Sequence, residues 1–179
     1  GMSKSLSEEL FDARAAIVSG ACNAGGNDLE GLLRALIDSA RTAWPTLVLD
    51  ERAFAAFLGT KLSRSADATG ALRALRTNDL YLAFGCSLGN AGAIAHFEAA
   101  YRTIIDGPLK RILRSEALIE EVRQQLRVKL FSGDPERPSK IVEYSGTGDL
   151  ASWLRAVAMR QALNVLRDEG REIPSGDVP

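Results

Sequence analysis

The sequence has little of the chemistry that enzymes and metal sites use. Its 179 residues include one histidine, His96, and two cysteines, Cys22 and Cys86, which have neither CxxC nor metal-ligand spacing. One histidine leaves no pair for a metal ion and weakens any Ser/His or Cys/His scheme. A phosphate-binding GxxxxGK[ST] motif is absent, and the glycine-rich stretch CNAGGND has no strand before it. We therefore predict that the protein is not an enzyme and uses no metal or cofactor.

Charge and hydropathy argue against two further classes. The 22 basic and 23 acidic side chains give a formal net charge of -1, unlike a protein that coats duplex DNA by charge alone. No apolar run approaches the ~20 residues that a membrane span needs. The two distant cysteines favour a reducing compartment, where both would act as inert apolar side chains. We predict a cytoplasmic protein without membrane contact.

Helical periodicity is present along almost the whole chain. Apolar residues recur every three or four positions, and strand-like alternation is almost absent. A hydrophobic content of 46% is enough for one globular core or two small ones. The pattern predicts an all-α fold, a helical bundle. The expected helices cover residues 6–22, 28–44, 51–62, 69–88, 91–105, 112–131 and 149–168.

Glycine and proline mark the expected breaks between helices. Gly107-Pro108 is expected to interrupt the helix that begins at residue 91. The longest irregular segment, 132–148, is rich in proline and glycine, and such long segments inside a compact helical domain are usually functional. A small, polar stretch at 63–69 marks the expected boundary between residues 1–70 and 71–179.

The stretch SGTGDLASWLRAVAMRQALNVLRDEGRE, residues 145–172, places a tryptophan among arginines. Asp149 is expected to be the N-cap of a helix that runs to Asp168, and no acidic residue lies between them. Projected at about 100° per residue, Trp153 falls on the polar side. The expected core stripe contains Leu154, Ala158, Met159, Ala162, Val165 and Leu166, with Arg155 among them. The polar arc around Trp153 contains Val157, Arg160, Asn164 and Arg167.

Trp153 has two interpretations. In the first, the indole caps the core near the helix start, while the arginines extend into water. In the second, the indole is exposed and stacks unpaired bases, which is worth about 1–3 kcal/mol per base, while the arginines hold phosphates. The absence of acids on this face favours the second interpretation. It also explains how a chain without net positive charge could bind nucleic acid.

These residues resemble the region 2 domain of extracytoplasmic-function sigma factors of the sigma-70 family. The run WLRAVA from Trp153, followed by Arg160, Asn164 and Arg167, is similar to the WLxxIAxNxxxDxxR signature of the promoter-melting helix. EEVRQQLRVKLF, residues 120–131, resembles the helix before it. NDLYLAFGCSLGNAGAIAHFEAAYRTII, residues 78–105, resembles the first helices of that domain. The three motifs occur in the family's order.

The resemblance implies a sigma factor that binds core RNA polymerase and recognises and melts the promoter -10 element. The helix over 120–131 would dock on the polymerase clamp, and segment 132–148 would capture a flipped base of the single-stranded -10 region. The implied polymerase contacts are Glu121, Gln124, Arg127 and Leu130. The implied DNA contacts are Lys140, Tyr144, Ser145, Trp153, Arg155, Arg160, Asn164 and Arg167. An anti-sigma factor is a further partner that the resemblance suggests.

The sequence also departs from the family. Arg160 stands where the family has asparagine and Asn164 where it has aspartate, so the face is more cationic and the base contact of that asparagine is in doubt. No room for a -35-binding domain follows residue 172, so we expect either a fragment or a protein without that domain.

Residues 1–70 lie outside the resemblance. They are expected to form a helical extension that packs on the region 2-like domain, or a cover over its binding face. The alternative function for the whole chain is a degenerate sigma-like module that binds a partner protein and no DNA.

Overall fold

The computed structural model describes residues 5–9, 26–62 and 67–172. Every regular element in these ranges is a helix, which confirms the predicted all-α class. In chain order they are α2 (Gly26–Ala43), α3 (Glu51–Lys61), α4 (Ala68–Arg73), α5 (Thr77–Ser87), α6 (Ala91–Ile112), α7 (Glu116–Phe131), the 3-10 helix η1 (Lys140–Glu143) and α8 (Leu150–Glu172). None of the described helices combines the length and the apolar character needed to cross a membrane. Of the helix expected over 6–22, residues 6–9 are described and are helical.

Four predicted boundaries were wrong, one of them the end of the last helix, because α8 continues past Asp168 to Glu172. The run over 69–88 is two helices, α4 and α5. The helix is interrupted between them, because the backbone N–H of Arg76 donates to the carbonyl of Gly146 at 2.8 Å and not to a carbonyl of the preceding helical turn. α6 continues through Pro108 to Ile112. A proline inside a helix removes one backbone donor, and burial of Leu109 beside it offsets that cost. Consequently α7 begins at residue 116, not at 112.

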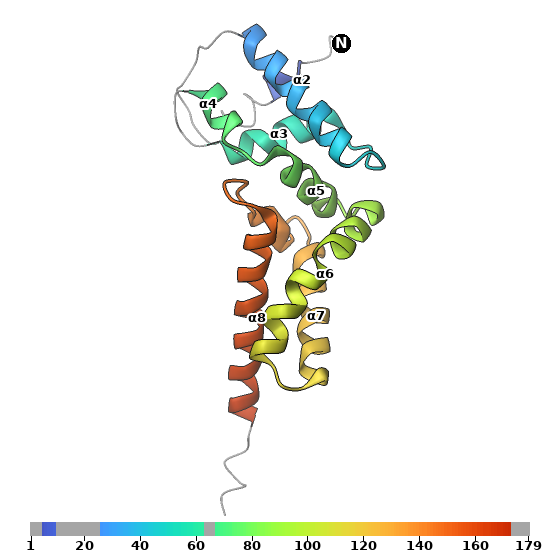
Figure 1. The fold of residues 1–179 in the computed structure, drawn as a ribbon. Helices are drawn as coiled ribbons and strands as arrows, with labels where there is room; N and C mark the ends of the chain where they lie inside the picture. The colour runs from blue at the N-terminus through green and yellow to red at the C-terminus, as the bar shows by residue number, and fades with distance from the viewer. Residues whose placement is uncertain (1–4, 10–25, 63–66, 173–179) are drawn as a thin grey trace, which may run out of the picture.

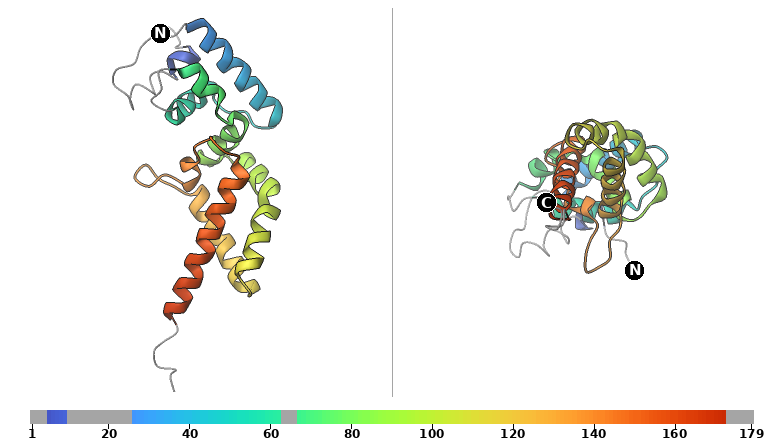
Figure 2. Two further views of the ribbon diagram at one scale, coloured as in Figure 1. Left: turned by 60° about the vertical axis from the view of Figure 1, so that its left-hand side comes forward. Right: turned by 90° about the horizontal axis from the view of Figure 1, so that it is seen from below.

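α5 lies in the middle of the molecule (Figure 1). α2, α3 and α4 lie at one end, and α6, α7 and α8 form a bundle at the other, which Figure 2 shows from two further sides. α5 packs against α2 and α3 in the first group and against α6 and η1 in the second. Eight of its eleven residues are buried, so its apolar surface covers more than one stripe, as expected for a helix enclosed by others.

Tyr81 connects α5 to the segment between α2 and α3. Its side chain is 1% exposed, and its hydroxyl donates to the carbonyl of Leu47 at 3.0 Å and accepts the N–H of Leu49 at 3.3 Å. The edge of its ring packs on Phe54, with centroids 5.1 Å apart. The described residues on both sides of residue 70 therefore share one hydrophobic core.

Cys86 is one of the buried residues of α5. Burial, with a smaller effect from Glu98, raises the pKa of its thiol to about 12. The thiol is therefore neutral at physiological pH, which agrees with the prediction of an inert apolar side chain. Cys22 lies outside the described residues.

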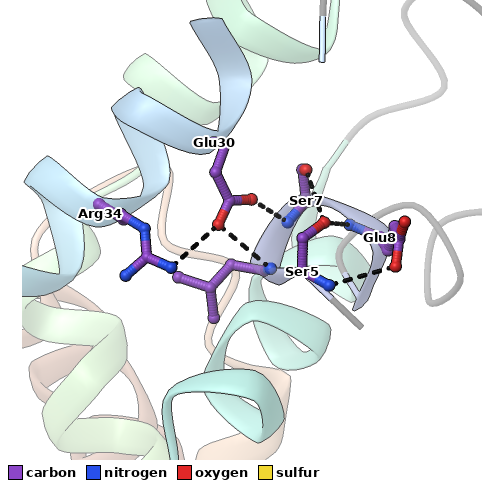
Figure 3. A network of polar contacts seen from close by, with 6 residues as sticks. Ser5, Ser7, Glu8, Glu30 and Arg34 are labelled. Carbon is purple, nitrogen blue, oxygen red and sulfur yellow. Dashed lines mark hydrogen bonds and ion pairs between the residues drawn. The ribbon is translucent and has the colours of Figure 1, made fainter. Parts of the chain in front are cut away.

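A carboxylate holds the first described turn of the chain on α2 (Figure 3). Ser5 and Glu8 cap this turn reciprocally: the Ser5 hydroxyl accepts the N–H of Glu8 at 3.3 Å, and the Glu8 carboxylate accepts the N–H of Ser5 at 3.1 Å. Glu30 of α2 accepts the N–H of Ser7 at 2.7 Å and that of Leu6 at 3.4 Å. The free N–H groups at the start of this turn thus all have acceptors.

The ionisation of Glu30 should control this contact. Partial burial raises the pKa of Glu30, but hydrogen bonds from Ser7 and Leu6 and the charge of Arg34 outweigh it, so the pKa lies below the ordinary 4.5. A carboxyl whose pKa is lowered on folding contributes stability above its ordinary pKa, and this contribution is lost as the pH falls through the lowered value. We predict that the Ser7 amide proton shift, followed by NMR, titrates with a midpoint below 4.5. Glu30→Gln should abolish the titration, whereas a midpoint at or above 4.5 would contradict the assignment.

Candidate nucleic-acid interface

α8 begins between two carboxylates. Asp149 accepts the N–H of Ser152 at 2.7 Å, which confirms the predicted N-cap, and Asp79 of α5 accepts the N–H of Leu150 at 3.1 Å. Hydrogen bonding from Ser152 lowers the pKa of Asp149. Two acidic groups at the positive end of the helix dipole stabilise this start. They also fix α8 to α5, which determines where the following arginines lie.

The buried stripe of α8 lies closer to Trp153 than predicted. Met159 and Leu166, which were assigned to the core, are 42% and 37% exposed, whereas Val157, which was assigned to the polar arc, is 4% exposed. α8 has large apolar residues on both sides of its buried stripe, so the sequence does not determine which side is buried. Packing on α6 and α7 determines it. The buried residues of the stripe are Leu150, Leu154, Val157, Ala158, Ala162 and Val165.

Trp153 lies at the edge of this stripe and is half-buried. It packs against the core, and its ring lies 5.8 Å from that of Tyr144, centroid to centroid, at an interplanar angle of 34°. Part of the indole caps the core, and the remainder is accessible from solvent.

The chain between α7 and η1 projects from the bundle in both views of Figure 2. Residues 132–138 are all exposed. Asp134 orders this loop, because its carboxylate accepts the N–H of Glu136 at 2.8 Å and that of Arg137 at 2.7 Å. The irregular segment that the sequence predicts is therefore a structured projection followed by one short helix.

The three predicted base contacts of this segment differ in exposure. Tyr144 is 1% exposed and its hydroxyl donates to the carbonyl of Gly148, so its ring has no free face for a base. Burial, with a contribution from Asp79, raises its pKa. Lys140 is partly exposed and forms an ion pair with Glu143. Ser145 is exposed, with its hydroxyl 2.8 Å from that of Thr147. Tyr144 is therefore a buried neighbour of the Trp153 ring. Ser145 is the most accessible of the three residues.

Residues from the N-terminal half hold this segment in place. The Lys61 ammonium of α3 donates to the carbonyl of Val142. Burial lowers the pKa of Lys61. The carbonyl of Gly146 accepts from Arg76, and Leu80 packs against the same glycine. Sequence reasoning missed Lys61, and no local signal could have revealed it, because its partner is 81 residues away.

Three arginines of α8 face solvent. Arg155, Arg160 and Arg167 are exposed, and none forms an ion pair with a described residue. Arg167 donates to the Asn164 side chain at 2.8 Å, and Arg160 makes a long bond of 3.4 Å to the carbonyl of Ala156. Their charges are therefore available to an external anion.

Of the predicted polymerase contacts on α7, Gln124, Arg127 and Leu130 line one groove and Glu121 does not. The groove lies between α6 and α7 and has a volume of about 250 Å³. Glu121 is exposed, does not line the groove, and accepts from Gln125 at 3.2 Å. Leu130 is 2% exposed and belongs to the core, so it presents almost no surface to a partner.

Ion pairs between α6 and α7 bracket the groove. Arg127 pairs with Glu98 at 2.7 Å, and Arg123 pairs with Asp106 at 2.7 Å. Both arginine heads are thus paired with acidic groups of the same chain. The apolar part of the groove lining consists of Phe97, Tyr101, Ile105, Leu126, Leu130 and Phe131.

Comparisons with protein-family models, with curated proteins and with solved structures each found no match for this chain.

The shape of the loop before α8 should depend on Gly146. Its φ of +79° is a left-handed conformation, and a Cβ there would lie 2.5 Å from Leu80 Cδ1. Gly89 has a similar φ of +70°, but nothing lies within 4 Å of its Cβ position. We predict that Gly89→Ala lowers the free energy of unfolding by about 1 kcal/mol, from φ alone. Gly146→Ala should lose that amount and a further 1–3 kcal/mol, roughly, from the clash. Equal losses in urea denaturation would show that Leu80 does not constrain the loop.

Proposed function

We propose that this chain is the region 2 portion of an RNA polymerase sigma factor. In this role it binds core RNA polymerase, recognises the single-stranded -10 element of a promoter and holds it open, without enzymatic activity. Support comes from the three sequence motifs in the family's order and from the all-helical bundle that carries them.

One observation carries the proposal: α8 presents Arg155, Arg160 and Arg167 to solvent without ion pairs among the described residues, beside a half-buried indole. Arg123 and Arg127 of α7, in contrast, pair with acids of α6. Arginines without ion pairs can bind the phosphates of a polyanion, and an aromatic ring beside them can stack unpaired bases.

The proposed mechanism divides these roles among the side chains. The arginines of α8 bind phosphates of the displaced strand, and Asn164 adds a hydrogen-bonding group beside Arg167. The accessible part of Trp153 stacks a base, with Tyr144 behind it. Ser145, exposed before the start of α8, hydrogen-bonds an extruded base. Sequence would thus be read from single-stranded bases, because the net charge of -1 gives little general affinity for duplex DNA.

Salt dependence provides the first test. The affinity for a fluorescein-labelled single-stranded -10-like oligonucleotide, measured by anisotropy, should fall as salt rises. Each of Arg155→Gln, Arg160→Gln and Arg167→Gln should reduce the slope of log K against log salt by about 0.7, because each removes one phosphate contact. Arg52→Gln, at an exposed position of α3, is the matched control and should leave the slope unchanged.

Two outcomes would count against DNA binding. Loss of slope in Arg52→Gln equal to that in the α8 variants would indicate attraction by overall charge only. No binding at low salt, with affinity for core polymerase retained, would favour the protein-interaction module instead.

Separate variants should divide polymerase binding from promoter opening. Arg127→Glu reverses a charge on the α7 groove and should weaken binding to core polymerase, because reversal of a charge at the rim of an interface slows association. Trp153→Ala should reduce open-complex formation while core polymerase binding persists. Trp153→Phe keeps a ring on Tyr144 and should retain most opening activity, and thermal unfolding verifies that each variant is folded. Equal opening by wild type and Trp153→Ala would refute the stacking role.

A further inference from the structure

The outer face of α8 carries an apolar stripe that the core does not use. Met159, Leu163 and Leu166 are 42%, 54% and 37% exposed, and they follow one another at i, i+4 and i+7. Side chains at this spacing lie on one face of a helix. This face points away from the buried residues of α8, such as Leu154 and Ala158.

The arrangement of these residues distinguishes them from ordinary surface residues. Single exposed apolar side chains such as Val128 and Leu88 are common on proteins and require no partner. In α8, by contrast, three large side chains adjoin, and the exposed Ala156 extends the stripe by one turn. From Ala156 to Leu166 the stripe is about 15 Å long at 1.5 Å per residue. Anchors at i, i+4 and i+7 over this length are typical of helix-to-helix docking.

The surrounding charge indicates the chemistry of the occupant. Arg155 lies on one side of the stripe, and Arg160 and Arg167 lie on the other, by their positions on the helix. No acidic residue of α8 precedes Asp168. A second copy of this chain docked on the same face would bring three more arginines and repel the first. A partner with carboxylates beside its own apolar stripe would neutralise them.

We propose that the outer face of α8 docks an acidic amphipathic helix of a partner protein. Leucine-like side chains of that helix pack on Met159, Leu163 and Leu166, and its carboxylates bind the arginines on both sides. The docking itself does not depend on DNA binding. One consequence does rest on the proposed function: because the same arginines are assigned to phosphates, the bound helix and the single strand exclude each other.

A designed peptide tests this surface directly. The probe is a fluorescein-labelled helical peptide of about 18 residues, long enough to cover the stripe, with leucines at i, i+4 and i+7 and glutamates on both sides. One control peptide has the same composition in scrambled order, and a second has lysine in place of each glutamate. Anisotropy of each peptide with the full chain should show binding of the acidic amphipathic peptide and at least roughly tenfold weaker binding of both controls.

Matched variants locate the binding site. Leu163→Ser should weaken peptide binding roughly tenfold, because it removes the central apolar anchor. Val128→Ser removes an equally exposed apolar side chain from α7 and should have no effect. Arg160→Gln should weaken binding and reduce its salt dependence. Thermal unfolding of each variant verifies that it is folded. Substitutions at these exposed positions should change the stability little.

Several results would overturn the proposal. Equal affinity for the ordered and scrambled peptides, or for wild type and Leu163→Ser, would show that the stripe is not a docking site. A wild-type dimer in sedimentation equilibrium that Leu163→Ser dissociates would assign the stripe to a second copy of the chain. Oligonucleotide binding is measured separately, so its absence would refute the proposed function and leave the docking site standing. Simultaneous binding of peptide and oligonucleotide would refute only their exclusion.

Discussion

Enclosure of α5 is the constraint on which the rest of the structure depends. A helix that is apolar on most of its surface must be covered on several sides, and here neighbours from both ends of the chain provide that cover. Tyr81 makes the arrangement specific, because its buried hydroxyl requires partners and finds them at Leu47 and Leu49. Asp79 of the enclosed α5 accepts a hydrogen bond from the first backbone N–H of α8, that of Leu150. The position of the solvent-facing arginines thus follows from a buried apolar helix.

The distribution of ion pairs separates α7 from α8. Arg123 and Arg127 of α7 pair with Asp106 and Glu98 of α6 along one groove. α8 has no acidic residue before Asp168, and none of Arg155, Arg160 and Arg167 forms an ion pair with a described residue. A chain with a net charge of -1 therefore still presents a local cationic face. Overall charge describes the behaviour of such a protein at long range, and the local distribution decides what it can bind.

The sequence predicted the features that are set locally. The all-α class follows from periodicity, and Asp149 could be identified as an N-cap because a cap bonds to residues three positions away. Contacts between distant parts of the chain were beyond prediction. Pro108 remains inside α6 because of packing around Leu109, and the buried side of α8 was misjudged because Met159 and Leu166 look as apolar as the residues that α6 and α7 cover. Tyr144 was expected to contact DNA, but it is buried against Trp153 and bonds to the carbonyl of Gly148.

The bonds that Lys61 and Arg76 make to the segment before α8 have a consequence for how the protein folds. They join parts of the chain that are far apart, so each closes a long loop, and such contacts tend to form late and slowly. The shape of the segment therefore depends on contacts with α3 and with the residue just before α5. Of these two elements, α3 lies outside the three motifs described in the sequence analysis, so part of the support for the segment comes from residues 51–61. A substitution that destabilises α3 should first increase local unfolding of the segment beside Trp153, at a lower free energy than global unfolding requires.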